Sequence, residues 1–128
     1  MDEAGIFDEM GEEGFRRLVA AFYRRISGDE LLGPMYPPDD LEGAKERLHL
    51  FLCFRFGGDS RYLETRGHPR LRMRHLPFRI GIAERDRWLL LMGEAVEECG
   101  LSPEAGRSLG AFFAQVADFM RNQEEATG

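Results

Sequence analysis

The run RGHPRLRMRHLPFR, residues 66–79, holds the side chains best suited to chemistry. Pro77 must end any helix that precedes it, because proline has no backbone N–H and disfavours a helical conformation in the residue before it. His75 is therefore predicted in the last turn or at the boundary of a short helix, with Leu71 four residues earlier on the same face. An imidazole in that position projects from an apolar surface and can hold a bound group.

Guanidinium groups surround this histidine. The run contains five arginines and no acid, in a chain of formal net charge −6. Such groups can clamp carboxylates or phosphates. The simpler alternatives are that His75 is an ordinary surface or core residue, and that the basic run is a solvated face or an RNA-binding patch. RNA binding is the less attractive of these, because Phe78 is the one aromatic residue in the run and the rest of the chain is acidic.

Length and composition indicate one soluble domain spanning residues 1–128, with 43% hydrophobic and 31% charged residues. No run is long and apolar enough to span a bilayer, and the acidic start MDEAGIFDEM is unlike a signal peptide. Cys53 and Cys99 lie far apart in apolar helical patterns, so we expect buried thiols in a reducing cytoplasm. The acidic balance argues against nucleic acid as the main partner.

Apolar residues recur with the period of an α-helix along most of the chain. The pattern predicts helices over residues 12–27, 40–56 and 84–99. Glycines bracket the first helix and end the second, as glycine does at helix C-termini. No stretch alternates in strand fashion for long, so the predicted fold class is all-α.

The connections between these helices carry turn signals. Prolines forbid a long helix in GDELLGPMYPPDD, and Pro37 restricts Tyr36 to extended conformations. Residues 59–68 are predicted to be irregular. Ser102 and Pro103 have the residue types of an N-cap and a first helical position. The helix that they begin is expected to bury Leu109, Phe112, Phe113, Val116 and Met120.

Three large polar aromatic residues, Tyr23, Tyr36 and Trp88, fall on or beside apolar faces. Buried tyrosine and tryptophan side chains normally find hydrogen-bond partners. For each residue alone, a bond to a backbone carbonyl in the core is a sufficient explanation. Together with the imidazole of His75, the three donors also suit a pocket around an apolar cofactor, where they could donate to a small polar ligand.

Conventional metal sites compete poorly with that interpretation. The chain has no CxxC and no HExxH, and it has no P-loop or nucleophile elbow. His49 follows Leu48 directly, so it is predicted to point away from the apolar stripe and to lie on the surface. His68 precedes Pro69 in a predicted loop. A haem needs only one imidazole, an apolar slot and cations for its two propionates, and this chain offers all three.

Four segments resemble group II of the truncated haemoglobins, the O-type bacterial globins. They are FYRRIS around Tyr23, MYPPDDLEGAKERL around Tyr36, GGDSRYLETRGHPRLRMRH through His75 and PFRIGIAERDRWLLLM through Trp88. Together they cover most of residues 15–92, whereas the last helix matches only in pattern. The chain departs from many members of the family just before its double glycine, where Arg55–Phe56 replaces a tyrosine followed by a tryptophan.

The resemblance implies a two-over-two helical sandwich around haem b, with His75 as the proximal iron ligand. The three polar aromatic residues would form the distal set. Ala44 would stand where familiar globins carry a distal histidine, and Leu48 would lie over the haem. The remaining pocket would draw on Phe22, Phe51, Leu52, Leu71, Met73 and Phe78. The propionates would contact Tyr62, Arg66, His68 and Arg74.

The function implied is high-affinity, slow-release binding of dioxygen, with carbon monoxide, nitric oxide and peroxide as other small ligands. Distal donors favour a ligand that carries partial negative charge, which makes the protein poorly suited to oxygen transport. Two alternatives stay open. One is a peroxidase-like enzyme or nitric oxide dioxygenase that uses a separate reductase, and the other is a haem-based gas sensor. We expect a cytoplasmic monomer or homodimer.

Overall fold

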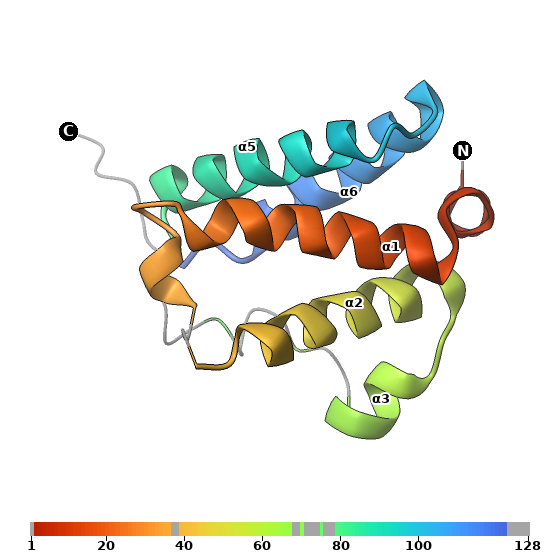
Figure 1. Cartoon of the computed structure of the whole chain (residues 1–128), viewed down its shortest axis with the longest axis horizontal. Coiled ribbons are helices and arrows are strands. Elements are labelled where there is room, and N and C mark those ends of the chain that lie inside the picture. Colours follow the sequence, from red (N-terminus) through yellow and green to blue (C-terminus); the bar gives the residue numbers. More distant parts are fainter. Residues whose placement is uncertain (1, 37–38, 68–69, 71–74, 76–78, 123–128) are drawn as a thin grey trace.

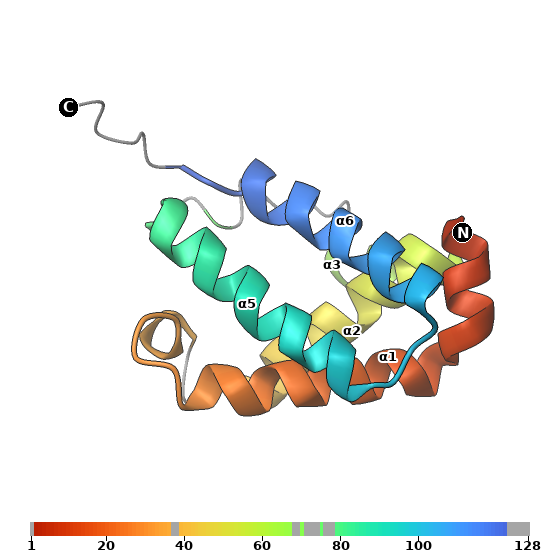
Figure 2. The ribbon, with the colours of Figure 1, turned by 90° about the horizontal axis from the view of Figure 1, so that it is seen from above.

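Two pairs of helices make up the architecture. The computed structural model describes residues 2–36, 39–67, 70, 75 and 79–122, and the regular structure over these residues is helical, as predicted. Helix α1 (Glu3–Ser27) packs on α2 (Leu41–Gly57), and α5 (Ile82–Glu98) packs on α6 (Pro103–Phe119) (Figure 1). Because α1 also contacts both α5 and α6, one pair lies over the other (Figure 2), which is the expected two-over-two sandwich.

Two short elements join the long helices. The 3₁₀ turn η1 (Gly33–Met35) lies between α1 and α2, and α3 (Arg61–Arg66) follows α2. The prediction that residues 59–68 are irregular is therefore wrong over most of its length. The Asp59 side chain accepts a hydrogen bond of 2.8 Å from the Arg61 backbone N–H, which helps to start the helix. None of the helices in the described part of the chain has the length and apolar character needed to cross a membrane.

The first helix begins well before its predicted start at residue 12. Asp2 caps its N-terminus by accepting a 2.8 Å hydrogen bond from Gly5 N–H. Gly11 then kinks the helix with φ 65° and ψ 175°, a conformation that glycine adopts without a steric penalty. The kink turns the N-terminal segment toward the end of α2, where a Cβ on Gly57 would lie 2.6 Å from the Phe7 ring. Glycine at both positions thus permits this close packing.

The prediction for His49 is also wrong, because the structure buries this residue instead of leaving it on the surface. Only 1% of the residue is exposed. The prediction considered a single apolar stripe on α2, whereas α1 covers the face on which His49 lies. There the Nε2 atom of His49 is 3.2 Å from Oε1 of Glu12. Of the two free cysteines, Cys53 is buried as predicted and Cys99 is half-buried.

The core contains a continuous series of aromatic contacts that passes through all four long helices. Ring centroids of successive members are 4.8 to 5.9 Å apart, within the range of favourable aromatic pairs. In order of contact the members are Phe7, Phe15, Phe56, Phe112, Phe113, Trp88, Phe22, Tyr23 and Tyr36. The core therefore extends without interruption from the start of α1 to the two tyrosines that the sequence singled out.

The start of α6 follows the prediction closely. Ser102 is the N-cap and its side-chain oxygen accepts a 3.2 Å hydrogen bond from Ala105 N–H, with Pro103 in the first helical position. Leu109 and Phe113 are buried, as expected. The other three residues of the predicted buried stripe are half-buried and line a cavity between the helix pairs, namely Phe112, Val116 and Met120.

Candidate functional site

A cavity of about 300 Å³ lies between the two helix pairs. Every candidate residue that the structure describes lines it: Phe22, Tyr23, Tyr36, Ala44, Leu48, Phe51, Leu52, Tyr62, Arg66, His75 and Trp88. The remaining candidates lie outside the described residues, namely His68, Leu71, Met73, Arg74 and Phe78. Residues far apart in the sequence thus meet at one space, although no single helix holds more than a few of them.

Tyr23 reaches the cavity from α1 and is 4% exposed. Its hydroxyl group lies 3.5 Å from the Ala44 carbonyl oxygen, to which it can donate. That separation is long for a hydroxyl hydrogen bond, so the bond is weak and the backbone only partly satisfies this hydroxyl. Burial raises the pKa of Tyr23, and the neighbouring Tyr36 raises it further. The phenol is therefore protonated, and a donor, near neutral pH.

Tyr36 adopts the extended conformation that its neighbour Pro37 predicts, with φ −109° and ψ 135°. Its ring meets that of Tyr23 edge to face at 5.4 Å. Burial raises the pKa of Tyr36 to about 12, and a hydrogen bond with the Trp88 side chain offsets part of the rise. Trp88 itself comes from α5 and packs edge-on against Phe22. Three elements thus present two phenols and an indole to the same side of the cavity.

His75 lines the same cavity and is half-buried. Its backbone carbonyl accepts a 3.2 Å hydrogen bond from Nδ2 of Asn122, just after α6. The Oδ1 atom of Asn122 accepts a 2.9 Å bond from Ile80 N–H, and Asn122 N–H donates to the Ile80 carbonyl. Asn122 therefore links His75 to Ile80, two residues before α5 begins. Sequence reasoning missed this residue, because an asparagine near the end of the chain gives no local signal of such a contact.

Arginines supply positive charge at the cavity wall. Arg66, a predicted propionate contact, lines this wall together with Arg47 and Arg85. Arg47 pairs with Asp40 at 3.1 Å, and Arg85 pairs with Asp118 at 2.8 Å. These contacts hold both guanidinium groups at the cavity wall, and neither residue is among the site residues predicted from the sequence. Tyr62 is buried, and its ring packs against Phe51 and Phe54.

Comparison with known proteins identifies the family. The family model described as bacterial-like globin matches residues 5–122. The chain belongs to this family. Within it, the globin is 39% identical over 120 residues to group 2 truncated hemoglobin YjbI of Bacillus subtilis, an alignment that covers 94% of this chain and 90% of the relative. Group II of the truncated haemoglobins, inferred from the sequence motifs, is thereby confirmed.

Solved structures agree on the fold of this globin. The thermostable hemoglobin of the actinobacterium Thermobifida fusca is 46% identical with a TM-score of 0.89, covering 94% of this chain and 98% of that one. A truncated oxygen-avid haemoglobin from Bacillus subtilis is 37% identical with a TM-score of 0.86, covering 91% and 98%. Membership of the family implies haem-based binding of small gaseous ligands.

The departure of this globin at Arg55 and Phe56 lies behind the cavity wall, against Phe112. Arg55 forms an ion pair with Glu3, and its guanidinium lies 5.3 Å from the Phe112 ring centroid. Phe56 packs between the rings of Phe15 and Phe112. The two residues therefore join the N-terminal segment to α2 and α6, and neither lines the cavity wall.

Proposed function

We propose that this globin binds haem b through His75 and holds dioxygen with high affinity and slow release. The observation that carries the proposal is the cavity, where His75 shares one space with Tyr23, Tyr36 and Trp88. Carbon monoxide and nitric oxide are the other ligands expected there. The similar protein of Bacillus subtilis that is described as oxygen-avid supports the same function.

The residues of the cavity fit a haem. Most of the wall is aliphatic or aromatic, as a porphyrin ring requires, and His75 offers an imidazole nitrogen. Arg47 and Arg66 offer guanidinium groups to the two propionates, which arginine binds with charge-assisted hydrogen bonds. Haem iron, when bound, supplies the centre at which a diatomic ligand is held.

Two phenols and an indole N–H form the distal donor set of the proposal. Ala44 leaves room beside them, since its methyl group occupies the place where familiar globins carry a histidine. The weak bond from Tyr23 to the Ala44 carbonyl is easily exchanged for a bond to a ligand that carries partial negative charge. At about 1 kcal/mol net for each hydrogen bond, three donors slow ligand release by about 100-fold.

The test is the rate of dioxygen dissociation, measured by stopped flow. The triple variant Tyr23→Phe, Tyr36→Phe, Trp88→Phe keeps an aromatic ring at each position and removes all three donors, so release is expected to be about 100-fold faster. Leu90→Ala, at an exposed position on α5, is the matched control and should release dioxygen at the wild-type rate. A triple variant with the wild-type rate would show that the donors do not retain the ligand.

A second measurement distinguishes a protein that only binds dioxygen from an enzyme that uses it to convert nitric oxide to nitrate. Nitrate formed from nitric oxide by the oxygenated protein is followed first in a single turnover and then with an added reductase and its electron donor. A binding protein gives at most one nitrate per haem under both conditions. Sustained nitrate formation with the reductase would instead establish a dioxygenase with a separate electron donor.

A further inference from the structure

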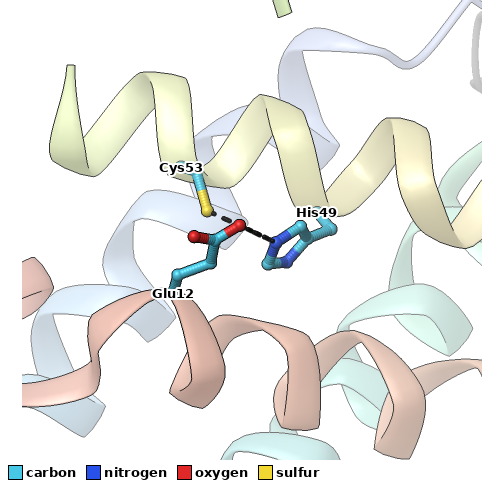
Figure 3. A group of neighbouring side chains, drawn as sticks. All are labelled: Glu12, His49 and Cys53. Atoms are coloured by element: carbon cyan, nitrogen blue, oxygen red, sulfur yellow. Dashed lines mark hydrogen bonds and ion pairs between the residues drawn. The ribbon is translucent and has the colours of Figure 1, made fainter. Parts of the chain in front are cut away.

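Three potential metal ligands converge where α1 crosses α2, away from the cavity (Figure 3). Glu12 extends from α1, whereas His49 and Cys53 are four residues apart on one face of α2. The Nε2 atom of His49 lies 3.2 Å from Glu12 Oε1 and 3.7 Å from Cys53 Sγ. The three ligand atoms all lie within 4.8 Å of one another.

We propose that Glu12, His49 and Cys53 bind one divalent cation of the zinc class. Zinc binds thiolate sulfur at about 2.3 Å and imidazole nitrogen or carboxylate oxygen at about 2.0–2.2 Å, in tetrahedral geometry. Those bond lengths separate the ligand atoms by roughly 3.3–3.6 Å. The observed distances from His49 Nε2 to the other two atoms are close to these values, so small side-chain rotations suffice to form the site. Thiolate, imidazole and carboxylate together select zinc over magnesium or calcium.

Burial holds two of the three ligands in place before any cation binds. His49 is 1% exposed and Cys53 is fully buried, so the packing of α1 on α2 fixes both side chains. Hydrogen bonding alone accounts poorly for a buried imidazole here. The Nε2 atom of His49 carries at most one proton to share between a carboxylate and a sulfur. A cation at Nε2 satisfies the carboxylate and the sulfur together.

The charges of such a site balance. Cys53 binds as the thiolate and releases its proton to solvent, so one thiolate and one carboxylate neutralise a divalent cation. Arg61 also contacts Glu12, at 2.6 Å, and it is held by Asp59 at the same distance. His49 and Arg61 both contact Oε1 of Glu12, so the carboxylate has to rotate when the cation binds, giving one oxygen to the cation while the other keeps the arginine. The positive charge of Arg61 is already offset by Asp59.

The site has a route to solvent. The Glu12 side chain is 46% exposed, which leaves an open side from which a cation enters and on which water can supply a fourth ligand. None of the three residues lines the haem cavity. Zinc binding can therefore be measured with the haem in place, and its outcome is independent of the proposed oxygen-binding function.

The experiment titrates zinc chloride into the haem-loaded protein by isothermal calorimetry, with metal analysis after equilibrium dialysis. We expect one zinc per chain in the wild type. Cys53→Ser, His49→Gln and Glu12→Gln should each weaken binding by more than about tenfold, since each removes one of three ligands. The matched controls Cys99→Ser and Glu13→Gln change the other cysteine and a neighbouring exposed glutamate, and they should bind zinc as the wild type does.

A second readout guards against a merely structural effect of the substitutions. Cadmium-113 bound to the wild type should give one NMR resonance in the region of thiolate ligation, and this resonance should move or vanish in Cys53→Ser but persist in Cys99→Ser. The haem absorption and circular dichroism spectra confirm that each variant is folded. Absence of stoichiometric zinc binding by the wild type, or equal affinity in Cys53→Ser and Cys99→Ser, would overturn the proposal.

Discussion

His75 and His49 are both withdrawn from bulk water, yet they face opposite kinds of surroundings. His75 is half-buried and faces a cavity of about 300 Å³ with a largely apolar wall. His49 is more deeply buried, its ring faces Glu12 and Cys53 at contact distance, and it does not line this cavity. The depth of burial therefore does not distinguish the two roles. The space beside each imidazole distinguishes them. The cavity beside His75 can hold a cofactor, whereas His49 can accept at most a proton or an ion.

The largest expected effect is a difference in haem retention between variants of the two histidines. His75→Ala should lose most of its haem and its axial-ligand spectrum, because this variant lacks the imidazole that we propose as the axial ligand. His49→Gln should keep both, since His49 does not line the cavity. Absorption spectra of the ferrous, oxygenated and carbonyl forms measure this directly. If both variants lost haem alike, the cavity would not be what distinguishes the two side chains.

The second prediction concerns the contribution of the buried His49 ring to the free energy of unfolding. His49→Ala leaves a void between α1 and α2, so the free energy of unfolding should fall by about 2–4 kcal/mol. Urea unfolding with a chelator present measures the loss independently of any zinc. Lys45→Ala is the control on the same helix, because its exposed pair with Glu42 contributes at most about 0.5 kcal/mol. A loss for His49→Ala no greater than that of the control would mean that the crossing adjusts to fill the void.

These two histidines also show what the sequence could and could not predict. Proline placement and helical period located His75 and the aromatic residues around it, because both signals are local. The position of His49 depends on which helix covers α2, and the periodicity of α2 alone does not show that α1 packs on this face. Asn122 is similar, since its contacts with Ile80 and His75 join segments distant in sequence. Local sequence patterns predict where a helix lies and which of its faces is apolar. They do not predict which residues of different helices come into contact, because that depends on how the helices pack.

Substitution of Asn122, which contacts His75, is expected to have an intermediate effect on stability and haem retention. Asn122→Ala removes the bonds to His75 and Ile80 and should lower the free energy of unfolding by about 1–2 kcal/mol. Asn122→Asp keeps an acceptor for Ile80 N–H but sets an oxygen against the His75 carbonyl. We therefore expect haem transfer to an apoprotein acceptor to be several-fold faster in both variants. Loss of stability with a wild-type transfer rate would confine Asn122 to a structural role.

The smallest effect concerns pH and the distal phenols. Burial raises the pKa of Tyr36 to about 12, above its ordinary value of about 10, so Tyr36 stays a donor throughout the neutral range. Dioxygen release should therefore change by less than about twofold between about pH 6 and about pH 9. Above about pH 10 the unfolded chain releases this proton while the folded chain retains it, so stability falls as pH rises toward 12. A release rate that accelerated below pH 9 would indicate that a phenol ionises earlier.

The unbroken series of rings from Phe7 to Tyr36 has a mechanical consequence. Each side chain rotates about only two bonds, and neighbouring rings pack against it. A ring can therefore change its rotamer only if the next ring in the series also moves. The orientation of the Tyr23 and Tyr36 hydroxyl groups therefore depends on this series of packed rings, whose other end lies in the first turns of α1. A smaller side chain at Phe7 would therefore increase the mobility of the Tyr36 ring, although Phe7 does not line the cavity.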